Sequence, residues 1–137
     1  MPMSTFLERL LQEGPVLTDG AWGTELQARG LAIGECPDGW NLTHPDRVES
    51  VARAYVEAGS RVILTNTFGA NRLRLSDQAP ALAGQVAEIN RAGARFSLRA
   101  AADRAFVFAS IGPSGRLMLD SDLDPAALES AFREQAV

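Results

Sequence analysis

The chain has 137 residues, of which 46% are hydrophobic and 22% charged, and its formal net charge is −4 at pH 7. This is ordinary globular usage in a chain long enough for one domain with a buried core, which excludes an intrinsically disordered chain. All 13 basic residues are Arg, so a Schiff-base aldolase and a Walker-type phosphate loop, which both need Lys, are excluded as well.

Positive charge gathers in the middle third of the chain, in a pattern that indicates a solvated helix face. Arg91, Arg95 and Arg99 recur every four residues, and no aromatic residues alternate with them for base stacking. Because the whole chain is acidic, we expect no nucleic-acid partner. The other arginines of this region are Arg72, Arg74 and Arg104.

Cysteine usage and hydropathy favour a cytoplasmic protein. A single cysteine, Cys36, excludes an internal disulfide and is compatible with a reducing compartment. The N-terminus lacks a basic segment followed by a long apolar run, and no stretch approaches the roughly 20 apolar residues of a membrane span. We therefore expect no membrane partner.

The first predicted element is a short helix over residues 5–13. Thr5 and Glu8 have the spacing of a capping box, and the apolar residues that follow recur on one helical face. Gly14 and Pro15 end this helix, because neither residue continues helical structure well.

A brief strand over 16–18 is predicted next, and it runs directly into the polar stretch 19–25, which begins with Asp19. From 28 to 40 we expect a loop, because glycines and a proline break any periodicity there. A loop of that length is long for a compact domain, which favours a functional role.

A helix is predicted from about Thr43 to Gly59. Thr43 and Asp46, with Pro45 in the first turn, mark its start, and apolar residues then recur at helical spacing. A short unbroken apolar run at 62–64 follows Gly59. Such a run is typical of a parallel strand covered on both faces.

Three hydrogen-bonding residues, Thr65, Asn66 and Thr67, stand directly after that strand. In an α/β barrel this end of a strand meets the active-site face, and Gly69 lets the loop turn. The structural alternative is that these Thr and Asn side chains only cap the next helix.

Apolar residues that step by four and three predict a helix over about 80–102, in which Gly93 indicates close packing. A third strand is expected at 105–111, and it again ends in polar or flexible residues. Asp124 then starts a last helix that still runs at Val137.

Strands beginning near residues 16, 62 and 106, with a helix in each interval, form a β-α repeat of about 45 residues. This alternation implies a parallel sheet, and polar loops after all three strands favour a (β/α)8 barrel over a doubly wound sheet. The predicted fold class is α/β, with about three β/α units of a TIM barrel that needs about 250 residues to close. We expect residues 1–137 to be the N-terminal portion of a larger barrel, or a chain that assembles with another.

With these stretches in view, the sequence resembles the homocysteine S-methyltransferase family. These are zinc barrels that include betaine-homocysteine methyltransferase and the homocysteine module of cobalamin-dependent methionine synthase. Five motifs match in order: Leu17-Thr-Asp-Gly-Ala-Trp-Gly-Thr-Glu-Leu-Gln27, Trp40-Asn-Leu before Pro45, Tyr55-Val-Glu-Ala-Gly59, Thr65-Asn-Thr-Phe-Gly-Ala-Asn71 and Ser110-Ile-Gly-Pro-Ser-Gly115.

The resemblance implies that a methyl group is transferred to the thiol of homocysteine to give methionine. In that family homocysteine binds at the C-terminal mouth of the barrel, where zinc stabilises the thiolate of a thiol whose free pKa is about 8.5. The resemblance implies that Asp19 holds the substrate ammonium, with Gly20, Asn66 and Thr67 as neighbours. The alternative for Asp19 is to cap a helix beginning near Thr24.

The family's zinc ligands are cysteines of later strands, one alone and then an adjacent pair, and this chain ends before either. Cys36 and His44 would give at most two soft ligands where zinc usually takes three or four. We therefore predict no metal ligand and no catalytic residue here, and an isolated chain that is inactive. The methyl donor, a corrinoid or another molecule, is left open.

The functional alternative is a non-catalytic, truncated or split-barrel chain that acts only by assembling with a complementary half. In either case an incomplete barrel leaves strand edges unpaired, so we expect self-association or pairing with the rest of the barrel.

Overall fold

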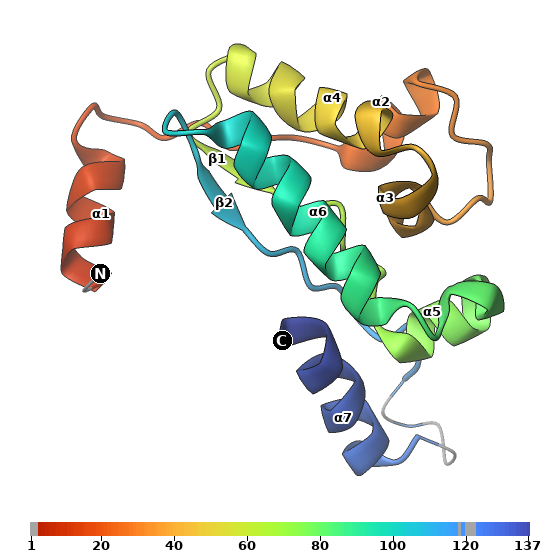
Figure 1. Ribbon diagram of the computed structural model, residues 1–137. Coiled ribbons are helices and arrows are strands. Elements are labelled where there is room, and N and C mark those ends of the chain that lie inside the picture. The colour runs from red at the N-terminus through yellow and green to blue at the C-terminus, as the bar shows by residue number, and fades with distance from the viewer. Residues whose placement is uncertain (1–2, 118, 120–122) are drawn as a thin grey trace.

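The computed structural model describes residues 3–117, 119 and 123–137. No helix in these ranges is long and apolar enough to cross a membrane. The elements are α1 (Met3–Leu11), α2 (Trp22–Ala28), η1 (Pro37–Gly39), α3 (Trp40–Thr43), α4 (Pro45–Glu57), β1 (Val62–Leu64), α5 (Arg72–Gln78), η2 (Pro80–Leu82), α6 (Val86–Ala101), β2 (Phe106–Phe108) and α7 (Pro125–Ala136). Two short strands form a parallel sheet, with α4 and α6 on one side of it and α1 beside the other (Figure 1).

The sheet has the predicted parallel sense, and its register sorts side chains onto two faces. Ile63 lies beside Val107, and both pack with residues of α4 and α6. Phe106 and Phe108 point to the opposite face, where the ring of Phe6 from α1 contacts both, with centroid distances of 4.8 and 5.9 Å. Two helices therefore cover one face, and α1 lies against part of the other.

The predicted strand at 16–18 is wrong as a full strand and is reduced to a single parallel bridge between Thr18 and Val62. The backbone still follows β1, since Asp19 N donates to Val62 O at 2.9 Å. However, the side chain of Leu17 is 63% exposed. This segment therefore lacks much of the burial that stabilises a regular strand.

The helix predicted at about 80–102 begins later, at Val86, because Pro80 opens a separate turn, η2, before it. A short helix that the periodicity did not indicate, α5, precedes that turn. It begins where the side chain of Asn71 accepts a hydrogen bond from Arg74 N at 2.9 Å, which satisfies one free amide of the first turn.

Two boundaries in the first half also differ from expectation. The predicted loop at 28–40 contains the turn η1, and α3 begins at Trp40, whose side chain is buried, only 2% exposed. Thr43 is the last residue of α3, so it does not cap α4, which begins after His44. The long helix predicted up to Gly59 is confirmed as α4.

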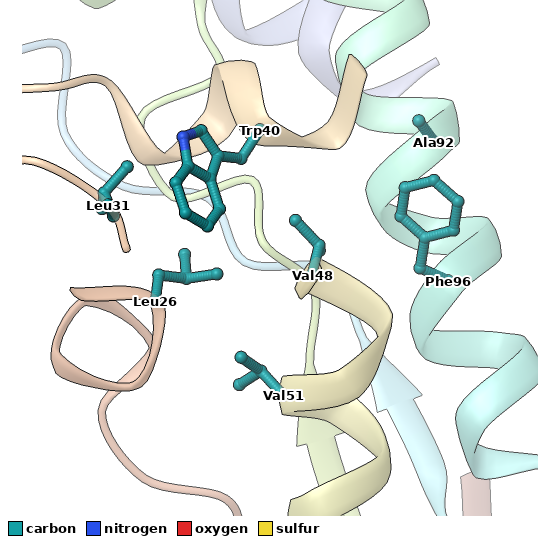
Figure 2. Close-up of a cluster of buried hydrophobic side chains, with 7 residues drawn as sticks. All are labelled: Leu26, Leu31, Trp40, Val48, Val51, Ala92 and Phe96. Atoms are coloured by element: carbon teal, nitrogen blue, oxygen red, sulfur yellow. The ribbon is translucent and has the colours of Figure 1, made fainter. Parts of the chain in front are cut away.

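The helices α4 and α6 pack along each other above the sheet (Figure 1). Figure 2 shows a cluster of buried side chains, in which the ring of Trp40 lies beside Leu26 and Leu31, and Val48 lies between it and Phe96 of α6. Burying such side chains contributes roughly 1.5 to 3 kcal/mol each. This core holds α2, α3 and α4 in place, and with them the loops at the carboxyl end of the sheet.

Candidate functional site

A pocket of about 320 Å³ lies at the carboxyl ends of β1 and β2, the edge at which parallel strands commonly bind ligands. Its wall comes from the loops after the 16–18 segment, β1 and β2, and from η1, α2 and α5. Its residues include Gly20, Trp22, Asp38, Asn66, Thr67 and Ser110.

Two larger hollows, of about 550 and 570 Å³, lie at the amino ends of the strands and along α4 and α6. Both contain arginines, and neither includes a predicted site residue. The smaller pocket gathers three of the four predicted residues, so we take it as the functional candidate.

Asp19, the fourth predicted residue, lies directly behind this wall. Its Oδ2 accepts hydrogen bonds from Trp22 Nε1 and from Leu64 N, both at 2.7 Å, and both donors belong to residues that line the pocket. The helix-cap alternative for Asp19 is wrong, because α2 begins after Ala21 and has no side-chain cap. Asp19 instead ties the first segment to the end of β1.

Asn66 and Thr67 are buried, and their polar groups mainly hold neighbouring loops together. Asn66 Nδ2 donates to Pro37 O and to Asn41 Oδ1, both at 2.9 Å. Thr67 Oγ1 donates to Ser110 O at 2.8 Å, next to a 2.6 Å contact with Thr65 Oγ1. These side chains do not cap α5, so that alternative is wrong for them. They shape the pocket wall, and substrate binding by them stays a prediction.

Gly20 is exposed at the pocket mouth beside Tyr55. A Cβ at position 20 would lie 3.1 Å from Tyr55 Oη, whose hydroxyl donates to Ala21 O at 3.0 Å. Burial, together with the nearby Glu25 and Asp19 carboxylates, raises the pKa of Tyr55. The tight contact explains why a small residue suits this turn.

Asp38 is a buried acid in the pocket that sequence reasoning did not find. It is 5% exposed, and its Oδ1 accepts from Gly69 N at 3.0 Å, which fixes the loop after β1. Burial raises the pKa of this carboxyl, and the Gly69 amide partly offsets that effect. Only the suspicion that the long loop before Trp40 was functional pointed toward Asp38.

The two soft metal ligands named from the sequence have unrelated surroundings. The Cys36 thiol faces Asp38 Oδ2 at 3.8 Å, and burial raises its pKa, which disfavours a thiolate. The His44 ring stacks on Trp40 at 4.4 Å. Within residues 3–117, 119 and 123–137, no group of three or more His, Cys, Asp or Glu residues could hold a metal ion. These residues therefore do not fit a zinc site.

Fold and site together define an α/β protein with a ligand pocket at the carboxyl edge of a parallel sheet. The model of the homocysteine S-methyltransferase family matches residues 16–137. The chain therefore belongs to the homocysteine S-methyltransferase family, as the five sequence motifs predicted.

Among curated proteins the chain is similar to two mycobacterial methionine synthases. It is 30% identical to that of Mycobacterium tuberculosis and 29% identical to that of Mycobacterium leprae, and each alignment covers 97% of this chain. The matched part is only 12% of either methionine synthase.

Among solved structures the chain resembles the homocysteine methyltransferase MmuM from Escherichia coli. The TM-scores are 0.77 for the metallated form and 0.73 for the oxidized form, at 23% and 22% identity. These matches cover 95% and 94% of this chain but 51% of each MmuM chain, so the chain spans about half the length of those proteins. At this identity the likeness establishes the fold alone.

Proposed function

We propose that this chain is the homocysteine-binding N-terminal part of an S-methyltransferase that methylates the thiol of homocysteine to give methionine. The family match over residues 16–137 carries the proposal. The pocket supports it, because Gly20, Asn66 and Thr67 line one hollow at the carboxyl edge of the sheet. In this proposal residues 1–137 are part of a cytoplasmic (β/α)8 barrel domain.

Asp19 is the proposed partner of the substrate ammonium. Its Oδ2 is held by Trp22 and Leu64, whereas its Oδ1 accepts no hydrogen bond from the described residues. A carboxylate oriented in this way can accept a charge-assisted hydrogen bond without reorganising. The remaining wall, made of buried side chains tied to each other, would keep the amino acid in one orientation.

The proposed enzyme depends on zinc, which we assign to the complete family barrel because the residues described here do not fit a zinc site. The donor, a corrinoid or another methyl donor, is left open. It follows that the 137-residue chain alone should form no methionine from homocysteine with any donor. Methionine production by the purified chain would contradict this part of the proposal.

Tryptophan fluorescence tests the binding step in this chain. Trp22 lines the pocket, whereas Trp40 is buried in the core, so homocysteine should change the Trp22 signal in a saturable way. The change should disappear in Trp22→Phe and persist in Trp40→Phe, and 1-propanethiol, which lacks the charged groups, should cause none. A folded chain whose Trp22 fluorescence does not respond to homocysteine would overturn the proposed function.

A further inference from the structure

Arg74 is a half-buried cation placed over the pocket. It lies in the first turn of α5 and lines the pocket wall, with its Cζ 6.0 Å from the centroid of the Phe68 ring. A Cβ built on Gly69 would lie 3.1 Å from Arg74 Nε, and one built on Gly115 would lie 3.8 Å from Nη1. The guanidinium therefore lies between the loops that follow β1 and β2.

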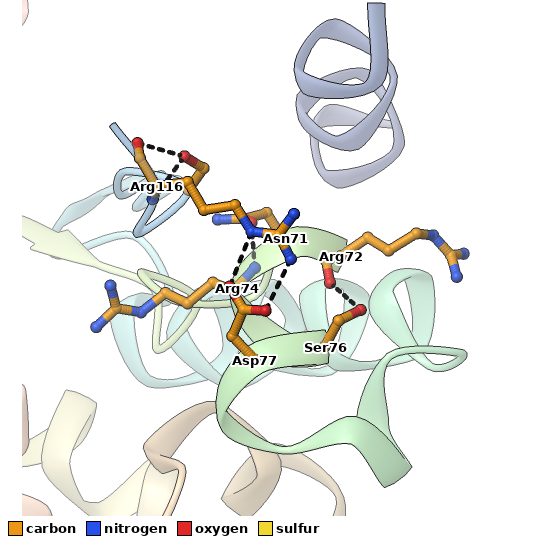
Figure 3. A network of polar contacts seen from close by, with 7 residues as sticks. Asn71, Arg72, Arg74, Ser76, Asp77 and Arg116 are labelled. Atoms are coloured by element: carbon orange, nitrogen blue, oxygen red, sulfur yellow. Dashed lines mark hydrogen bonds and ion pairs between the residues drawn. The ribbon is translucent and has the colours of Figure 1, made fainter. Parts of the chain in front are cut away.

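The charge of Arg74 acts on the carboxyl of Asp38, but the carboxylates of Asp38 and Asp77 form their hydrogen bonds with other groups. Asp77, one turn along α5, is bonded by Arg116 through Nε at 3.0 Å and Nη2 at 2.7 Å. Figure 3 shows this pair, and the guanidinium of Arg74 extends away from it without a dashed line. Asp38, across Gly69, accepts from Gly69 N and from the Cys36 thiol.

No acceptor among the described residues is therefore bonded to the Arg74 side chain, although it is partly withdrawn from water. A guanidinium presents five N–H donors in a fork that matches a carboxylate, and a ring face beside it adds to the stabilisation of the cation. Gly69 keeps this space open, since a Cβ there would also lie 2.7 Å from Asp38 Oδ2.

We propose that Arg74 binds the carboxylate of a zwitterionic ligand in this pocket. Arg74 would complement the carboxylate of such a ligand, and Asp19, as proposed above, its ammonium. Asp38 lies across Gly69 from Arg74, and burial raises the pKa of its carboxyl. Two sources of the carboxylate are compatible with this chemistry, homocysteine itself and a methyl donor that carries an ammonium and a carboxylate. The first source rests on the proposed function, and the second does not.

Nuclear magnetic resonance of the ¹⁵N-labelled 137-residue chain tests the proposal. The Nε–Hε signal of Arg74 is identified by its absence from Arg74→Gln. Homocysteine should shift this signal in a saturable way, and Arg74→Gln should bind homocysteine on the order of tenfold or more weakly, as expected for one charge-assisted contact. The aminothiol 3-aminopropane-1-thiol, which lacks the carboxylate, should bind both chains equally.

Two variants act as controls. Arg104→Gln makes the same change in charge at the amino end of β2, beside a different hollow, and should leave homocysteine binding unchanged. Arg74→Lys keeps the charge but loses the fork, so its affinity should lie between those of the original chain and Arg74→Gln. The backbone amide spectrum of each variant checks that the fold is kept.

Glycine betaine and choline distinguish the two sources, because choline has a hydroxymethyl group where glycine betaine has its carboxylate. If glycine betaine shifts the Arg74 signal in a saturable way, and neither choline nor homocysteine does so, the carboxylate belongs to a methyl donor. The Arg74 proposal then stands even if Trp22 fluorescence shows no homocysteine binding. If the original chain and Arg74→Gln bind homocysteine equally strongly, and glycine betaine causes no Arg74 shift, the Arg74 proposal is overturned. The proposed function remains intact in that case. No saturable Arg74 shift with either carboxylate also overturns it.

Discussion

Asp19 combines a structural bond with the proposed contact to substrate, and two substitutions separate them. Asp19→Asn keeps an oxygen that can accept from Trp22 and Leu64 but removes the negative charge. We expect homocysteine affinity to fall about ten- to a hundredfold, because a charge-assisted contact of roughly 1.5 to 3 kcal/mol is lost. The free energy of unfolding should change by less than about 1 kcal/mol.

Asp19→Ala also removes the acceptor, so the Leu64 amide loses its partner, and the variant should lose about 1 to 3 kcal/mol of stability. Titration calorimetry and denaturant unfolding measure the two quantities. Unchanged homocysteine affinity in Asp19→Asn, measured in a chain that binds homocysteine, would remove Asp19 from the site.

Asp38 makes stability depend on pH in a direction opposite to that of a paired carboxylate. Burial raises its pKa above the ordinary 3.8, so the native state binds this proton more tightly than the unfolded chain does. The unfolding free energy contributed by Asp38 therefore decreases as pH rises from about 4 through the raised pKa. Asp38→Asn cannot ionise, so its stability relative to the original chain should increase over that range.

Urea unfolding of both chains at several pH values between about 3.5 and 7 measures this difference. Asp77→Asn is the control of opposite sign, because the bond from Arg116 lowers the pKa of Asp77. That variant should lose relative stability as pH rises from the lowered pKa to about 4, below the range in which Asp38 acts, so for this control the measurements extend below about pH 3.5. A difference for Asp38→Asn that does not vary with pH would contradict the prediction.

At the scale of elements, α6 packs directly on the loop that carries the predicted site residues. A Cβ at Gly93 would lie 2.7 Å from Thr67 Cγ2, 2.8 Å from Asn41 Nδ2 and 3.4 Å from Asn66 O. Both side chains are fixed, since Asn41 donates to Asn66 O and Thr67 donates to Ser110 O. The close packing that the sequence indicated at Gly93 is confirmed, and it supports the pocket wall.

Gly93→Ala should therefore destabilise the chain, although alanine favours a helix. The overpacking cost of roughly 1 to 3 kcal/mol exceeds the gain in helix propensity of about 1 kcal/mol. Gly23→Ala in α2 is the matched control, because a Cβ there meets nothing within 4 Å, and it should not lower stability. A Gly93→Ala chain that unfolds at higher temperature than the original would contradict the inferred packing.

At the scale of the whole molecule, the sheet leaves apolar surface uncovered. Leu17 is 63% exposed beside β1, and Phe108 at the end of β2 is 43% exposed. Two strands alone form a marginal sheet, and exposed strand edges pair with other chains. This surface is where the rest of a barrel would continue, or where a second copy would bind.

We expect the isolated chain to self-associate or to be only marginally stable, as sedimentation and thermal unfolding would detect. Leu17→Lys should reduce association, because it replaces exposed apolar surface by charge at the edge. Leu98→Lys makes the same exchange on the exposed side of α6, where Leu98 is 59% exposed, and should have no effect. A stable monomer with a sharp unfolding transition would contradict the expectation.

Local pattern was sufficient to predict α4, β1, the start of α7 and the family. The helical spacing up to Gly59 and the apolar run at 62–64 gave α4 and β1, and Asp124 caps α7 by accepting from Ala126 N at 3.0 Å, as its position indicated. Such features depend on neighbours within a few residues, which is why the sequence alone determines them.

Tertiary structure alone decided which polar groups face the pocket. Asn66 and Thr67 bond inward to partners 25 and 43 residues away. Asp38, from a segment with no periodicity, and Arg74, from a helix that the spacing did not indicate, meet across Gly69. The 16–18 segment forms only a single bridge to β1, and its Leu17 side chain is largely exposed. Hydrophobic periodicity predicts only which side of an element is buried. The hydrogen-bond partner of a buried polar group comes from a distant segment, which a local pattern does not predict.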